Sequence, residues 1–233
     1  MAQMTGLQSL AQQLQTQMAQ LQAQVQQLAG QQTQVQAQVQ QLFAQVAATP
    51  TAPAPSVPVT PVPPAGRTAP PIQNITNQLK RDPNKQFPTR PLSEIQMIVI
   101  HHTAVAPTVG ADRIAEHRVD KQGWPGIGYH YFVTQDGQIQ QTNELTTVAT
   151  HAGSYNPLAI GVCFAGDFTQ TGPTPAQIDA GAQLIAWLLR QFNLSLQAVF
   201  GYKELVNTQS PGLQWDSGLR WGDQLRQKIE ADL

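Results

Sequence analysis

The chain has 233 residues, a formal net charge of −1 and a single cysteine, Cys163. A net charge this close to zero argues against electrostatic binding of nucleic acid, so we expect no nucleic-acid partner. One cysteine excludes an intrachain disulfide, and the apolar run 159–165 around it predicts a buried thiol that packs as a small hydrophobic group. The sequence has no stretch of about 20 apolar residues, so we expect no membrane span.

Composition divides the chain into two parts. No Asp, Glu, Lys or Arg precedes Arg67, and glutamine dominates residues 1–46. All Trp and Tyr residues lie beyond position 120. Because a core needs such large side chains, we expect one globular domain at residues 73–233.

Residues 1–47 are predicted to form a coiled coil. The two apolar seams of the heptad pattern are Leu7, Leu14, Leu21, Leu28, Val35 and Leu42, and Met4, Ala11, Met18, Val25, Gln32, Val39 and Val46. An apolar stripe on a single helix needs a partner, so we expect self-association through this coiled coil into a homo-oligomer. The alternative is a disordered glutamine-rich tract.

Residues 48–72 are rich in proline, alanine, threonine and valine. This composition is typical of an extended, stiff linker. We expect an inert spacer, and the alternative is a ligand for an SH3-type domain.

Strand and helix signals alternate in the rest of the chain. Apolar strands are predicted at 97–100, 159–164 and 199–200, and a hairpin of two strands at 129–134 and 138–142. Helices are predicted at 111–121, at 175–191 behind the cap Thr174, and at 216–231. This order predicts an α/β domain with a mixed β-sheet flanked by helices.

Several short motifs then identify a resemblance. They are Ile98-Val99-Ile100-His101-His102-Thr103, Gly128-Tyr129-His130, His151-Ala152-Gly153, Asn156, Ile160-Gly161-Val162 and Ser210-Pro211-Gly212. Over residues 90–215 the chain resembles the type 2 N-acetylmuramoyl-L-alanine amidases, a family that includes phage amidases and peptidoglycan recognition proteins. The resemblance implies an amidase-like α/β fold and a peptidoglycan or muropeptide partner.

The resemblance also implies three zinc-ligand positions, which are His101, Tyr202 and Ser210 here. The family places His at the first two positions and Cys or Asp at the third. Catalytic zinc needs about three good protein ligands and an open position for water. Tyr202 is a phenol and Ser210 a neutral hydroxyl, neither of them a common zinc ligand. We therefore expect no cofactor in the substituted site, and zinc only if the site is active.

Alternatives for His101 stay open. It is either a buried histidine without metal, or a ligand in a rearranged zinc site with His151. In the first case the ring of Tyr202 fills the volume that metal and imidazole would take.

The resemblance places Tyr129 and Thr208 where the active family stabilises a developing oxyanion, and we expect both to bind a ligand carbonyl. The other expected ligand-binding residues are His102, Thr103, Trp124, His130, His151 and Asn156. Strand alternation predicts that His102 faces away from His101, and His130 away from Tyr129. The alternatives are core packing for Tyr129 and Trp124 and a turn role for Asn156. His117 is expected at the surface.

Three functions are weighed from these residues. The first is muropeptide recognition without catalysis, because the segment 208–212 resembles the non-catalytic recognition proteins that carry Ser in place of Cys. The second is an active zinc amidase, and the third is a structural or assembly protein. The sequence shows no secretory signal, so we expect cytoplasmic synthesis, with release by lysis, specialised export or assembly into a particle.

Overall fold

The computed structural model describes residues 68–233 and part of the N-terminal segment, namely Gln12, Gln13, Gln15, Gln17, Met18, Gln20, Gln22 and Gln24. The chain divides into two compact units, Met1–Pro58 and Val59–Leu233, and each is described by itself. The described N-terminal residues are helical, and Met18 has an exposed side chain. The other seam residues of the coiled coil and most of the linker lie outside the described residues, so coiled coil, linker and self-association stay predictions.

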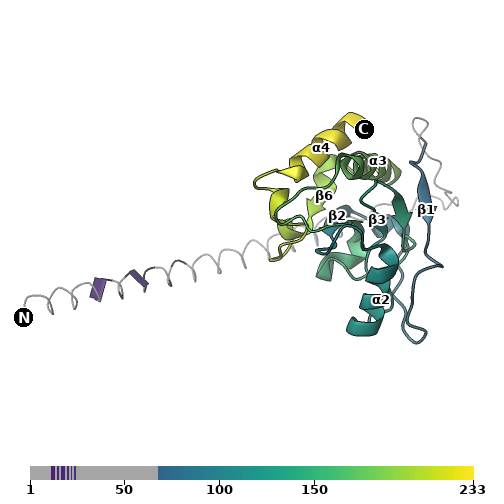
Figure 1. Ribbon diagram of the computed structural model, residues 1–233, viewed down its shortest axis with the longest axis horizontal. Coiled ribbons are helices and arrows are strands. Elements are labelled where there is room, and N and C mark those ends of the chain that lie inside the picture. The colour runs from purple at the N-terminus through teal and green to yellow at the C-terminus, as the bar shows by residue number, and fades with distance from the viewer. Residues whose placement is uncertain are drawn as a thin grey trace, which may run out of the picture. The chain divides into compact units, whose positions relative to one another are not determined.

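A mixed β-sheet forms the centre of the second unit (Figure 1). Its strands are β1 (Ile72–Asn74), β2 (Met97–His102), β3 (Tyr131–Val133), β4 (Ile139–Gln141), β5 (Ala159–Phe164) and β6 (Val199–Gly201). Their spatial order is β1-β4-β3-β5-β2-β6. Only the β3–β4 hairpin is antiparallel, and the other neighbours pair in parallel. This arrangement confirms the predicted α/β class with a mixed sheet.

Three α-helices cover the sheet: α2 (Ala111–Gln122), α3 (Pro175–Gln191) and α4 (Trp221–Asp232). Short 3-10 turns connect the elements at Leu92–Glu94, Gly153–Leu158, Leu196–Ala198, Tyr202–Glu204 and Leu213–Trp215. Thr174 caps α3 as predicted, because its hydroxyl accepts from the backbone N–H of Gln177, whose own side chain accepts from the N–H of Thr174. Gly123 ends α2 with a φ of 65°, a left-handed conformation that glycine adopts at little cost.

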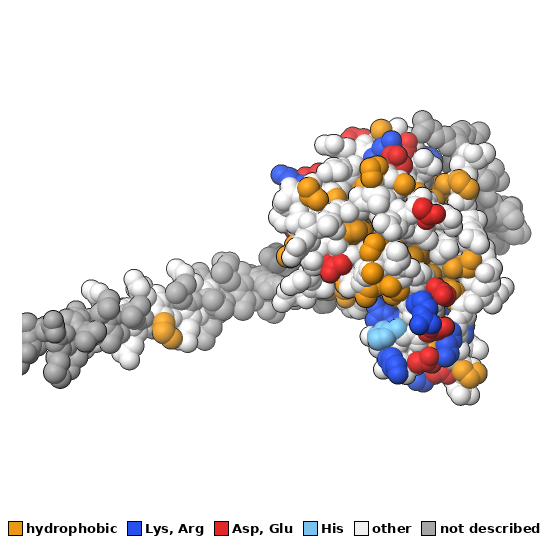
Figure 2. All heavy atoms as spheres, viewed as in Figure 1, with side chains coloured by type: hydrophobic (Ala, Val, Ile, Leu, Met, Phe, Trp, Pro, Cys, Tyr) orange, Lys and Arg blue, Asp and Glu red, His pale blue; other side chains and the backbone are white. Residues whose placement is uncertain are grey.

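The helices divide between the two faces of the sheet. α3 and α4 pack together on one face, and α2 lies on the other (Figure 1). Strand alternation sends Ile98 and Ile100 of β2 into the large apolar core under α3 and α4. Val99 belongs to a small apolar cluster on the opposite face. Figure 2 shows charged side chains gathered around α2 and fewer charges over the rest of that view.

The predicted elements occur with shifted ends. The helix predicted from 216 begins at Trp221, because Gly218 and Arg220 adopt positive φ angles of 54° and 49° that a helix does not allow. The strand β1 was not predicted. Cys163 is buried, as expected. No helix of the described parts of the chain is long and apolar enough to span a membrane.

Candidate functional site

A cleft of about 670 Å³ opens at the end of β2, on the sheet face that α2 covers. Ligands of open α/β sheets commonly bind beyond the carboxyl ends of the strands, where loops converge. The cleft is lined by His101, His102, Thr103, Ala104, Arg118, Trp124, Tyr129, Thr150, His151, Gly153, Asp167, Thr169, Tyr202, Thr208, Gln209 and Ser210. Most of the residues expected in the site therefore lie together in one cleft, although they come from positions spread between 101 and 210 of the sequence.

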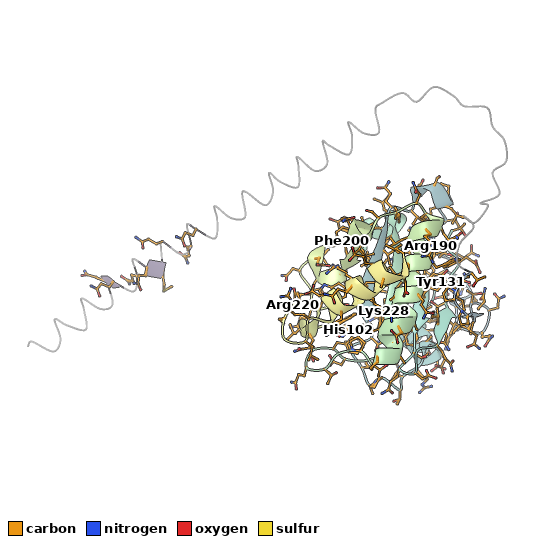
Figure 3. The ribbon with its side chains drawn as sticks, turned by 90° about the horizontal axis from the view of Figure 1, so that it is seen from above. His102, Tyr131, Arg190, Phe200, Arg220 and Lys228 are labelled. Atoms are coloured by element: carbon orange, nitrogen blue, oxygen red, sulfur yellow. The ribbon has the colours of Figure 1, made fainter. Side chains whose placement is uncertain are left out.

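The two adjacent histidines of β2 point to different neighbours. His101 packs against the rings of Tyr129 and Tyr202, at centroid distances of 5.3 and 4.9 Å. His102 stacks on Phe168 at 5.9 Å, and its Nδ1 accepts a hydrogen bond of 3.1 Å from the backbone N–H of Phe168. Phe168 belongs to the core under α3 and α4, so the opposite directions expected for the pair are confirmed. His102 is labelled in Figure 3.

His101 also forms a direct contact with His151. Its Nε2 lies 3.1 Å from Nδ1 of His151. Burial, with the charges of His102 and Arg118 adding to it, lowers the pKa of His101 to about 3. Burial likewise moves the pKa of His151 well below its ordinary value. Both rings are therefore neutral at pH 7, and one donates to the other.

His130 lies behind His151 and does not line the cleft. Its Nδ1 accepts from the N–H of Gly161 at 3.0 Å, which leaves the proton on Nε2 to donate to the carbonyl of Thr147 at 2.9 Å. The ring meets His151 edge-on, with centroids 5.6 Å apart. Both nitrogens of His130 are thus occupied by the protein itself.

Asn156 also acts from outside the cleft lining. Its side-chain oxygen accepts from the backbone N–H groups of His151 and Ala152, at 3.0 and 2.6 Å. The amide therefore fixes the loop that carries His151. This contact corresponds to the turn role that the sequence left open for Asn156.

Arg118, Trp124 and Tyr129 form one wall of the cleft. The guanidinium of Arg118 lies 4.5 Å from the ring centre of Trp124, and its Nη2 donates to the phenol oxygen of Tyr129 at 3.4 Å. Burial raises the pKa of Tyr129, so its phenol stays neutral and keeps a proton to donate. Arg118 forms no salt bridge with any residue that the structure describes.

The opposite wall comes from the loop after β6. The backbone N–H of Lys203 donates to the carbonyl of Ser210 at 2.7 Å, which ties Tyr202 and Ser210 into one turn. The Ser210 hydroxyl oxygen is buried and has no hydrogen-bond partner among the described residues. Thr208 accepts from the N–H of Ser210 at 3.4 Å. Tyr202 packs on the small cluster that contains Val99.

The donor atoms of the cleft do not fit a zinc site. The described residues contain no group of three or more His, Cys, Asp or Glu side chains placed to hold a metal ion. His101 and His151 supply two imidazoles, and these two rings form a hydrogen bond with each other. The remaining neighbours, Tyr202 and Ser210, offer a phenol and a neutral hydroxyl, which bind zinc poorly.

The sequence did not identify several residues of the cleft. Arg118, Thr150, Asp167, Thr169 and Gln209 line it and were not predicted. A signal for Arg118 existed, since it lies near the end of a predicted helix, six residues before the expected site residue Trp124. The other four residues lie in loops, and the local sequence does not predict the conformations of these loops.

A family model described as N-acetylmuramoyl-L-alanine amidase matches residues 91–213. Peptidoglycan-recognition protein SC1a of Drosophila melanogaster is 26% identical over 132 residues, covering 53% of this chain and 71% of that protein. The endolysin of Enterobacteria phage T3 is 31% identical over 114 residues, covering 46% of this chain and 75% of that protein.

Solved structures show the same fold. One is the ectodomain complex of peptidoglycan recognition proteins LCa and LCx with bound tracheal cytotoxin. It matches with a TM-score of 0.55 and 26% identity, covering 61% of this chain and 90% of that chain.

Proposed function

Because the chain belongs to the N-acetylmuramoyl-L-alanine amidase family, we propose that its cleft recognises peptidoglycan fragments (muropeptides) and does not hydrolyse them. The observation that carries this proposal is the ring of Tyr202, which packs 4.9 Å from the ring of His101. In the family resemblance Tyr202 and Ser210 stand at two of the three zinc-ligand positions. A phenol ring and a neutral hydroxyl supply neither the imidazole nor the negative charge that holds the metal there.

Recognition of a ligand without hydrolysis requires no metal, and the cleft lining supplies the groups for it. Tyr129 has a neutral phenol whose oxygen accepts from Arg118 and whose proton faces the weakly accepting sulfur of Cys163, so a ligand carbonyl can take that proton's hydrogen bond in place of the sulfur. Thr208 adds a hydroxyl from the opposite wall. Trp124 offers a flat apolar surface, and the guanidinium stacked on it supplies positive charge for an anionic group of the ligand. His102, Thr103 and His151 complete the lining.

A second candidate function is an active amidase with a rearranged metal site. The observation that favours it is the distance of 3.1 Å between His101 Nε2 and His151 Nδ1. Two imidazole nitrogens bound to one zinc ion lie at a similar separation, roughly 3.3 Å for tetrahedral geometry. This candidate still lacks a third ligand of ordinary zinc chemistry, so recognition without catalysis is the better-supported function.

We also propose that residues 1–47 form an oligomerising coiled coil, joined by a linker of residues 48–72 to the recognition domain of residues 73–233. The heptad seams of the sequence support the coiled coil. Oligomerisation would present several clefts to one polymeric ligand, and linked weak sites raise the effective concentration of each other. A repetitive cell-wall polymer is a ligand on which such avidity acts.

The test uses the full chain with two assays run in parallel. Calorimetry measures binding of a soluble muropeptide, and chromatography measures the release of free stem peptides from purified peptidoglycan with added zinc. A zinc-dependent amidase serves as the positive control for release. The proposal predicts binding without release, and Arg118→Gln is expected to weaken the binding.

The other results have distinct meanings. Release of stem peptides by the wild-type chain would overturn the proposal and assign the catalytic function around His101 and His151. Absence of both binding and release would also overturn it, leaving the structural or assembly role.

A further inference from the structure

A buried arginine, Arg90, lies behind the cleft wall. Its side chain is only 4% exposed. No carboxylate of the described residues forms a salt bridge with it, and Glu94 acts on it only at longer range. A buried cation without a close counter-ion is costly, so a side chain that merely filled space here would be expected to be apolar.

The guanidinium binds backbone carbonyls of two loops. Nε donates to the carbonyl of Leu145 at 3.1 Å, and Nη1 donates to the carbonyls of Asn156 and Pro157 at 3.0 and 2.8 Å. The backbone N–H of Arg90 adds a bond of 2.8 Å to the carbonyl of Thr146. One side chain thus joins the loop after β4 to the turn before β5.

The turn before β5 connects directly to His151. Asn156, whose carbonyl Arg90 holds, uses its side-chain oxygen to hold the N–H groups of His151 and Ala152. Displacing the backbone of Asn156 would therefore displace the loop that carries His151 into the cleft.

A second path from Arg90 runs through His130. Arg90 Nη2 lies 3.3 Å from His130 Nε2, the nitrogen that carries the proton donated to Thr147. Two donors cannot hydrogen-bond to each other, so the guanidinium acts here as a close neighbour that bounds the position of the His130 ring. The neutral ring packs edge-on against His151 at 5.6 Å.

The space for His151 is tightly bounded on its remaining side. A Cβ atom on Gly161 would lie 2.8 Å from Cγ of His151, closer than such contacts occur. His151 is therefore enclosed by Gly161, His130 and Asn156, and bonded to His101 at its Nδ1. A shift of its loop toward Gly161 or His130 has no free volume in which to be absorbed, so a displaced His151 would move at the cleft wall.

We propose that Arg90 is a positioning residue that sets the place of His151 in the cleft wall through Asn156 and His130, without touching the ligand itself. The expected effect of Arg90 on ligand affinity rests on the proposed recognition function. The expected effect of Arg90 on the position of His151 does not depend on that function.

The experiment compares variants of the full chain. Arg90→Met removes all of the side-chain bonds, and Arg90→Lys keeps the charge but cannot reach several carbonyls at once. Asn156→Ala removes the link to His151. Arg190→Met is the matched control, because Arg190 is a partly buried arginine on α3 that also donates to a backbone carbonyl, that of Asp232 at 2.7 Å (Figure 3).

Two readouts are measured for each folded variant. One is the affinity for a soluble muropeptide, and the other is the imidazole ¹⁵N signals of His151, assigned by their loss in His151→Asn. We expect Arg90→Met and Asn156→Ala each to lower affinity about tenfold, and the double variant to lose little more than either single change. Both should shift the His151 signals, Arg90→Lys should give an intermediate result, and Arg190→Met should change neither readout.

The outcomes separate this proposal from the proposed function. If the wild type does not bind muropeptide, the recognition function fails, while the His151 signals still test Arg90. If Arg90→Met folds with unchanged His151 signals and unchanged affinity, Arg90 is only a structural residue and the proposal is overturned. If Arg90→Met does not fold, Arg90→Lys carries the test, and unchanged readouts in it together with Asn156→Ala overturn the proposal equally.

Discussion

The two faces of the sheet differ in what they bury. The face under α3 and α4 holds one large apolar core, including Trp215 and Trp221 packed edge-on at 4.6 Å. The face under α2 holds small apolar clusters, and next to them His101, His151 and His130 in a buried row backed by Arg90.

Neighbouring residues of β2 illustrate this division. Ile100 and His102 point toward the large core, where His102 bonds to the backbone of Phe168. Val99 and His101 point to the other face, where His101 contacts the rings of Tyr129, His151 and Tyr202. The larger apolar core thus lies on the first face, whereas the second face buries imidazole and guanidinium groups beside its smaller apolar clusters. Such groups are costly to bury and are suited to binding a polar ligand.

Rebuilding a metal site should change the chemistry of the α2 face more than any other substitution. Tyr202→His combined with Ser210→Cys supplies an imidazole and a thiolate beside His101, so we expect zinc affinity to rise more than about a thousandfold. Chelator competition measures that affinity. Tyr202→Phe with Ser210→Ala is the matched control and should bind zinc no better than the wild type. Equal zinc affinity in the wild type and the rebuilt chain would show that the substitutions do not decide metal binding.

Two core truncations test whether the two faces of the sheet are separate in function. Leu188→Ala under α3 and Ile127→Ala under α2 both empty fully buried positions, and each is expected to lower the free energy of unfolding by about 2–5 kcal/mol. Only Ile127→Ala should also weaken muropeptide binding, because Ile127 packs in the cluster that holds Tyr129. Urea denaturation and calorimetry measure the two effects. Loss of affinity in Leu188→Ala as well would contradict the separation of the faces.

Acid should destabilise the domain through its buried histidines. Burial lowers the pKa of His101, His102, His130 and His151, to about 3 for His101 and His130. In the unfolded chain these histidines bind protons near pH 6.5, whereas in the folded chain they stay neutral. The free energy of unfolding therefore has its full value above pH 6.5 and falls as the pH decreases toward 3. Each such histidine contributes a slope of up to about 1.4 kcal/mol per pH unit.

Urea denaturation of the domain between pH 7 and pH 5 measures this slope. His117→Asn is the control, because His117 is exposed on α2, and the variant should keep the wild-type slope. Constant stability across this pH range would contradict the neutral, buried state of the histidines.

The smallest expected effect concerns the cap of α3. Thr174→Ala removes the hydroxyl that accepts from Gln177 and donates to the carbonyl of Gln135 at 2.8 Å. We expect about 1 kcal/mol of lost stability and no change in muropeptide affinity, since the cap lies on the α3 face. Thermal denaturation with calorimetry checks both, and Thr171→Ala, a nearby exposed threonine, serves as the comparison.

Much of the fold could be predicted because its signals are local. The turn Asp136-Gly137 fixes the hairpin through a glycine with a φ of 84°, and the cap Thr174 with Pro175 fixes the start of α3. The end of the chain was harder, because Asp216 looks like a helix cap, while the positive φ of Arg220 delays α4 by five residues. The short strand β1 is defined by its partner β4, and pairing between distant segments leaves no local pattern.

The candidate site could be predicted where the type of residue in a short motif indicated its role. His101, Tyr129, His151 and Tyr202 lie together as the motifs indicated. Arg90 could not be found this way, because its importance comes from three carbonyls supplied by loops that lie 55 to 67 residues away. For His130, the alternation rule gave a direction but not the two backbone partners that occupy its ring.

The short edges of the sheet have a consequence for solubility. β1 and β6, the two outermost strands, span three residues each, and the carbonyl of Val199 in β6 accepts from Arg226 at 3.3 Å. Exposed edge strands are templates on which other chains add strands and aggregate, and short or covered edges resist this. Several copies of this domain held close together would therefore stay separately folded, and would not pair through their sheet edges into fibrils.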